Sequence, residues 1–130
     1  MVTTVQISMS EVSESGKHYN GTFTIKTVLT RRDNFTADAI RREVLGPSPE
    51  GTVVLPDLQF EAYMLGQLRV RIVNAPEWWT NSNFGLDMED GDIIAKLYAL
   101  VVKEEGKSKA ELKKESEKAL EQLKKTPVGE

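Results

Sequence analysis

Residues 22–27, which read Thr-Phe-Thr-Ile-Lys-Thr, alternate polar and apolar side chains and are rich in residues that favour strands. The segment before them repeats this pattern, with an apolar side chain at every second position from Val5 to Met9. A period of two places the apolar side chains on one face of a strand. We therefore predict an antiparallel hairpin with strands over Val2–Ser10 and about His18–Thr30. A lone hairpin is only marginally stable in water, so this one must pack against other elements.

Helical periodicity follows the hairpin. Its strongest run extends from Pro56 to Val73, where apolar residues recur on one face. Proline suits the first turn of a helix, and Pro76 then ends this one. Gly66 lies inside the run at a cost of about 0.5–1 kcal/mol relative to alanine. We interpret this glycine as the sign of a close crossing by another helix.

A shorter helix is predicted over Ala37–Leu45. Thr36 is a suitable N-cap for it, and Gly46 with the proline that follows ends it. Residues 46–54 then form a loop that superficially imitates a phosphate-binding loop. Thr52 occupies the position where that motif needs a lysine, so we assign no nucleotide to the loop.

The C-terminal part contains two further predicted helices. One covers about Asp90–Glu104 with its apolar side chains facing inward, and Gly106 stops it. Residues 108–111 match a capping box and open a second helix that continues to about Lys125. The apolar stripe of this last helix is thin and offsets little ordering entropy, so the helix is either frayed or docked on another chain.

These elements predict an α+β fold, in which an N-terminal antiparallel β-hairpin packs on a small helical bundle and a C-terminal helix projects from it. We assign residues 1–105 to a single α+β domain and residues 106–130 to a charged C-terminal helical extension. The eight lysines and seven glutamates of residues 103–130 are typical of a solvated helix.

Composition excludes several chemistries within one chain. The 130 residues include no cysteine and one histidine, which excludes disulfides, thiol nucleophiles and multi-histidine metal sites. The net charge of −3 leaves no basic footprint for nucleic acid. No apolar run approaches the roughly 20 residues of a membrane span, and the N-terminus has no signal-peptide pattern. We therefore expect no cofactor, no metal, no membrane partner, and a location in the cytoplasm.

The side chains that perform catalysis elsewhere are scattered here. His18 has no serine, cysteine or carboxylate beside it in the pattern of a catalytic triad. Residues 87–92 imitate a calcium loop, but Gly91 falls one position early and Tyr98 occupies the position of the bidentate glutamate. We interpret the segment as an acidic helix start, where carboxylates meet free amide groups. The chain is predicted to be non-enzymatic.

Trp78 and Trp79 are the strongest candidates for a partner surface. Each ring buries about 150–250 Å² when it packs, and adjacent side chains tend to point apart. Two interpretations stay open: both rings fill the space between the two long helices, or one lies exposed as a binding hot spot. The candidate partner-binding residues are Trp78, Trp79, Arg69, Arg71, Phe84, Leu112, Leu120 and Leu123.

The order of these elements resembles the tail assembly chaperones of long-tailed bacteriophages. Three segments carry the resemblance, residues 21–32, 39–47 and 68–79. It implies a non-enzymatic protein of the host cytoplasm that coats the tape measure protein while the tail is built. The family has no invariant site that can be transferred to this chain.

Two alternatives remain beside this interpretation. One is a virion structural protein (a head decoration, connector or tail component) that forms a ring or lattice, and both it and the chaperone predict a homo-oligomer. The other is a small regulator of a host protein or nucleic acid, acting through Arg31, Arg32, Arg41 and Arg42. Acidic residues interleave with these arginines, which favours surface salt bridges over nucleic-acid binding.

Overall fold

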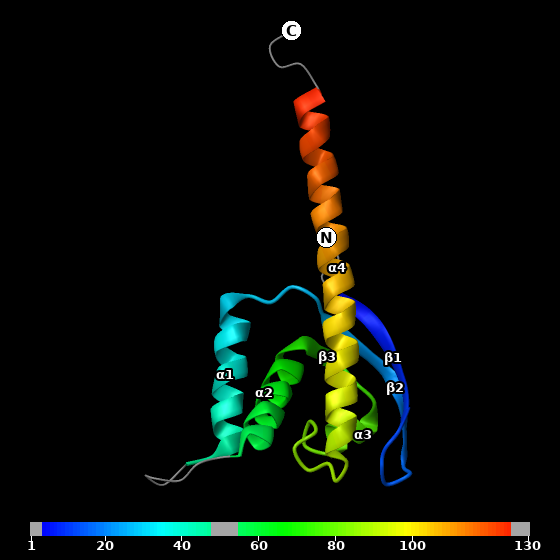
Figure 1. Cartoon of the computed structure of the whole chain (residues 1–130), viewed down its shortest axis with the longest axis vertical. Helices are drawn as coiled ribbons and strands as arrows, with labels where there is room; N and C mark the ends of the chain where they lie inside the picture. Colours follow the sequence, from blue (N-terminus) through cyan, green and yellow to red (C-terminus); the bar gives the residue numbers. More distant parts are fainter. Residues whose placement is uncertain (1–3, 48–54, 126–130) are drawn as a thin grey trace.

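The computed structural model describes residues 4–47 and 55–125, and its elements confirm the α+β class (Figure 1). In chain order they are β1 (Thr4–Val12), β2 (His18–Lys26), α1 (Arg31–Leu45), α2 (Pro56–Arg71), β3 (Ile72–Asn74), α3 (Glu77–Asn81) and α4 (Gly91–Lys125). Most of the predicted loop at 46–54 lies outside the described residues. No helix in the described part of the chain is both long and apolar enough to cross a bilayer.

The sheet has three antiparallel strands in the order β1-β2-β3. The predicted hairpin is confirmed, with Ile7 opposite Phe23 and the ladder running to Val12 opposite His18. The alternation seen in the sequence places the buried residues of both strands on one face. That face becomes one wall of the core.

β3 was not predicted and corrects the end of the long helix. α2 stops at Arg71 rather than at Val73, and Ile72 pairs with Ile25 of β2. Ile72 and Val73 are β-branched, so they favour a strand wherever a sheet edge lies within reach. The register of β3 shifts between Thr24 and Ile25, so the strand joins the sheet irregularly.

α1 begins six residues earlier than predicted. Thr30, not Thr36, is the N-cap, because Thr30 and Asp33 form a reciprocal capping box. The Oγ1 atom of Thr30 accepts from the Asp33 amide at 3.1 Å, and Asp33 accepts from the Thr30 amide at 3.0 Å. The predicted C-terminal end is confirmed: Gly46 has a φ of 71° and its amide donates to the carbonyls of Arg42 and Glu43.

The close crossing predicted at Gly66 is confirmed. The glycine lies against the backbone of α1 at Ala37 and Arg41, so that a side chain there would overlap the carbonyl oxygen of Ala37. α1 and α2 therefore pack with their backbones in near contact. Ala37 and Gly66 are both buried at this crossing.

α4 is one continuous helix, which corrects the predicted stop at Gly106. The capping-box sequence 108–111 lies inside the helix, and the proposed boundary between residues 105 and 106 falls within α4. A glycine in a helix interior costs only about 1 kcal/mol, and ion pairs bracket this one. Glu105 pairs with Arg71 at 2.6 Å and with Lys109 at 2.9 Å. Figure 1 shows α4 running past the hairpin and continuing beyond the rest of the fold.

The core lies between the buried face of the hairpin and the helices. It draws side chains from β1, β2, α2, α3 and α4, and the largest fully buried apolar ones are Trp79, Phe23, Ile25, Leu68, Ile93, Leu97 and Val101. Contacts of α4 with both α2 and β1 close this core from one side. The N-terminal half of α4 is thus part of the domain.

Candidate protein-binding groove

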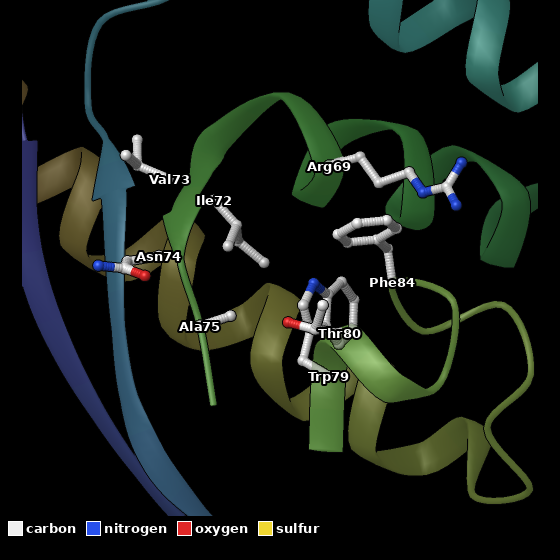
Figure 2. Close-up of a pocket in the computed structure, with 8 residues that line it drawn as sticks. All are labelled: Arg69, Ile72, Val73, Asn74, Ala75, Trp79, Thr80 and Phe84. Carbon is white, nitrogen blue, oxygen red and sulfur yellow. The ribbon is translucent and has the colours of Figure 1, made fainter. Parts of the chain in front are cut away.

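A surface groove with a volume of about 400 Å³ lies beside β3. One wall is the continuous run Ile72–Ala75, and the other is built by α2, α3 and the turn after α3 (Figure 2). The lining residues are Arg69, Ile72, Val73, Asn74, Ala75, Thr80, Phe84 and the almost fully buried Trp79. Apolar side chains and one cation therefore face the same opening.

The groove accompanies an unpaired strand edge. β3 pairs with β2 on one side, and no strand of the described residues pairs with its other side. In Figure 2, β3 stands between β2 on one side and Trp79, Thr80 and Phe84 on the other. An edge strand presents free backbone N–H and C=O groups, which another extended chain can use.

Phe84 is held at the groove by an unusual backbone turn. Asn83 and Phe84 both have a φ of 55°, and Gly85 follows at 89°. A left-handed conformation is uncommon for a bulky residue such as phenylalanine and carries strain. The amide of Asn83 donates to the Thr80 carbonyl at 3.2 Å, and the Gly85 amide donates to Ser82 Oγ at 3.1 Å. In this turn Phe84 is 46% exposed and lines the groove.

Arg69 is the cation of the groove. Its guanidinium carbon lies 5.4 Å from the centre of the Phe84 ring, and one terminal nitrogen donates to the Asn83 carbonyl at 3.1 Å. No carboxylate of the described residues lies within salt-bridge distance of it. The guanidinium is therefore oriented by neutral groups and keeps its charge available.

Arg71 lies two residues further on and has a different environment. It forms an ion pair with Glu105 in which both side chains are only 12% exposed. Burial acts to raise the pKa of Glu105, but hydrogen bonds from Arg71 and Lys109 outweigh it and lower that pKa. Arg71 thus joins α2 to α4 and is not among the residues that line the groove.

The two tryptophans have separate structural tasks. Trp79 is 1% exposed, so it packs in the core and supports the groove from beneath. Gly85 packs directly on its ring. Trp78 is half-buried: its Nε1 donates to the Asn20 carbonyl at 2.9 Å, and its ring packs edge-on against Tyr19 at 5.0 Å. Trp78 therefore joins α3 to β2.

The structure brings together three of the eight predicted site residues, namely Arg69, Trp79 and Phe84. Leu112, Leu120 and Leu123 lie on the projecting part of α4, where the last two are exposed. The wall Ile72–Ala75 and Thr80 were not predicted from the sequence. The signal for the wall was present, because the β-branched pair Ile72 and Val73, a few residues before Pro76, favours a strand over a helix end.

The acidic segment before α4 joins the hairpin to that helix. Asp90, buried immediately before Gly91, accepts from Ser15 Oγ at 2.7 Å and from the Tyr19 hydroxyl. The bond to Asp90 raises the pKa of Tyr19 to about 12, and the bonds from Tyr19 and Ser15 lower the pKa of Asp90. Within residues 4–47 and 55–125, no three His, Cys, Asp or Glu side chains converge as metal ligands would.

Two of the four arginines considered for nucleic acid form the expected surface ion pairs. Arg41 lies 3.0 Å from one carboxylate oxygen of Asp38, and Arg42 lies 3.2 Å from the other. Both pairs follow the helical spacing that brings such groups together. Their charge is thus shared with a neighbouring carboxylate.

Comparisons of the chain with protein-family models, with curated proteins and with solved structures find no match.

Proposed function

We propose that the chain is a non-enzymatic assembly protein whose groove beside β3 takes a segment of a protein client. The observation that carries the proposal is the joint presence of an unpaired strand edge and the exposed Phe84, which strained backbone holds at a groove of about 400 Å³. Strain of this kind persists where surrounding structure over-determines it, and it clusters at functional sites.

The resemblance to tail assembly chaperones supplies the client. On this proposal the protein acts in the cytoplasm of a bacterial host, binds the tape measure protein of a bacteriophage during tail construction, and leaves before the particle is complete. Burial of a phenylalanine side chain contributes about 1.5–3 kcal/mol. Phe84 is therefore expected to be a hot spot of the interface.

A second function is favoured by α4. The helix projects beyond the domain with Leu120 and Leu123 exposed, which suits contacts between copies in a ring or lattice. A virion structural protein of this kind stays in the mature particle in stoichiometric amounts. A chaperone is absent from it.

The test compares infected-cell lysate with purified particles and uses two matched variants. Phe84→Ala removes the exposed ring of the groove, and Phe35→Ala removes a ring on α1 that is 74% exposed. We expect the tape measure protein to co-purify with the wild type and with Phe35→Ala. Phe84→Ala is expected to weaken this binding by about 2 kcal/mol, or roughly 30-fold.

Two results contradict the proposal. Equal capture of the tape measure protein by all three proteins places its binding outside the groove. Stoichiometric copies of the chain in mature particles reject the chaperone in favour of the structural alternative. Circular dichroism of both variants checks that they remain folded.

A further inference from the structure

We propose that the segment bound in the groove is an extended, mostly apolar peptide, which adds to β3 as a fourth strand and places one carboxylate against Arg69. This inference rests on the proposed function and specifies the chemistry of its client. Three observations carry it: the form of the groove, the charge of Arg69, which no carboxylate of the described residues pairs, and the absence of other cations among the lining residues.

The form of the groove fits an extended chain. One wall is the run Ile72–Ala75, of which β3 covers Ile72–Asn74, and at about 3.3 Å per residue this strand offers room for roughly three residues of a partner strand. The Ile72 amide already donates to the Leu68 carbonyl, so it is not available to a peptide. A peptide on an edge strand obtains affinity from main-chain hydrogen bonds and specificity from pockets for alternate side chains. Ile72, Ala75 and the border of Trp79 form the apolar surface for such a side chain.

The charge of the groove selects an acidic residue in that chain. Arg69 is held by the Phe84 ring and by the Asn83 carbonyl, and neither neutralises it. On the same helix, Arg71 forms an ion pair with Glu105 of the same chain. Guanidinium and carboxylate groups match in planar geometry and form the stronger, charge-assisted hydrogen bonds. A carboxylate of the bound peptide would form with Arg69 the ion pair that Glu105 forms with Arg71.

The small number of cations at the groove argues against a polyanion as its ligand. Arg69 is the one cationic side chain among the lining residues, and the chain carries a net charge of −3. Nucleic acids and anionic membranes are recognised by clusters of cations. A single guanidinium between walls of mainly apolar residues, with Asn74 and Thr80 as the uncharged polar ones, fits one carboxylate of a mostly apolar peptide.

The experiment is a selection from a display library of random unstructured peptides on the full chain. The wild type is compared with Arg69→Glu and with Arg32→Glu, which reverses an exposed arginine of α1 away from the groove. We expect the wild type and Arg32→Glu to enrich peptides with alternating apolar residues and Asp or Glu at one constant position. Arg69→Glu is expected to replace that acidic residue with Lys or Arg.

A second measurement tests the strand geometry. The best wild-type peptide is synthesised with alternate backbone nitrogens methylated, in the two possible sets, and binding is followed by fluorescence anisotropy. One set removes the N–H groups that face β3 and should weaken binding at least tenfold, while the other should leave it nearly unchanged. If Arg69→Glu fails to fold, Arg69→Gln replaces it, with loss of the acidic preference expected.

The inference is overturned if no peptide is enriched, if Arg69→Glu selects the same acidic peptides as the wild type, or if the enriched peptides have helical apolar spacing. It is also overturned if neither methylated set weakens binding. These outcomes differ from failure of the proposed function. If Phe84→Ala still loses the tape measure protein while acidic peptides are not selected, the groove binds its client and only the stated chemistry is wrong.

Discussion

The groove beside β3 and the junction between the hairpin and α4 both place a charged group beside aromatic rings. Only at the junction do hydrogen bonds from the same chain reach both oxygens of the charged group. At the junction, the Asp90 carboxylate receives hydrogen bonds from Ser15 and Tyr19 on both of its oxygens. In the groove, the Arg69 guanidinium meets a ring and one carbonyl, and no carboxylate of residues 4–47 or 55–125 pairs with it. A charge whose partners lie within the chain contributes to folding, whereas a charge without them is available for recognition.

A chain of ring contacts connects these two regions. Trp79 borders the groove and meets Trp78 at 6.5 Å between ring centres, and Trp78 meets Tyr19 at 5.0 Å. Tyr19 then bonds to Asp90. The groove and the junction therefore share one aromatic support, and a change at its buried end should affect both.

The largest effect is expected from Trp79→Ala, which removes that support. A cavity of this size in the core should lower the free energy of unfolding by about 3–5 kcal/mol. Denaturant unfolding followed by circular dichroism measures it. Phe35→Ala, at an exposed position, is the control and should change stability by less than about 0.5 kcal/mol. A loss below about 1 kcal/mol for Trp79→Ala would contradict its place in the core.

Acid should weaken the junction before it affects the groove. Hydrogen bonds from Tyr19 and Ser15 lower the pKa of Asp90, so its stabilising effect is present above the unfolded value of about 3.9. That effect is lost as the pH falls through the lower pKa of the folded state. Melting temperatures of the wild type and of Asp90→Asn between pH 6 and 2 should therefore converge at the acid end. A difference that stays constant with pH would show that the Asp90 charge is not involved.

Tyr19→Phe should have a moderate effect, because it removes one donor to Asp90 and keeps the ring that packs on Trp78. The loss of this hydrogen bond is expected to cost about 1 kcal/mol in unfolding experiments. In a double-mutant cycle with Asp90→Asn, the combined loss should be smaller than the sum of the two single losses. Additive losses would mean that the two groups do not interact.

The smallest effect on stability is expected at Arg69. Arg69→Gln should change the free energy of unfolding by less than about 0.5 kcal/mol, because the guanidinium has no ionic partner to lose in the part of the chain that the structure describes. Arg71→Gln breaks a largely buried ion pair with Glu105 and should cost about 1 kcal/mol or more. Thermal unfolding of the two variants side by side measures the contrast. Equal losses at both positions would contradict the distinction between Arg71, which is paired with Glu105, and Arg69, which has no ionic partner among the described residues.

Local patterns predicted the hairpin, the long helix and its close crossing. The alternation of residues 22–27 and the glycine at position 66 each depend on neighbours in the chain, so they can be read without the fold. Two features were predicted wrongly, the start of α1 and the continuity of α4, because two local sequence patterns competed at each place. Thr30 with Asp33 forms a better cap than Thr36, and a run bracketed by ion pairs tolerates Gly106 within a helix.

The candidate site was predicted only in part. Arg69, Trp79 and Phe84 were predicted as site residues. The sequence alone did not distinguish Arg69 from Arg71, nor one tryptophan from the other. Residues two apart on a helix point in different directions, so only packing decides that Arg71 meets Glu105 on α4. The wall Ile72–Ala75 required knowledge of the sheet edge that β3 joins.

Side-chain periodicity, capping and turn chemistry act over a few residues, and for that reason the amino-acid sequence alone determined the α+β class, the hairpin and the helical stretches. Tertiary structure decided the rest: the third strand, the continuity of α4, which tryptophan is buried, and which arginine keeps an unpaired charge. Each of these depends on groups far apart in the chain that only folding brings together, such as Arg71 with Glu105 and Tyr19 with Asp90.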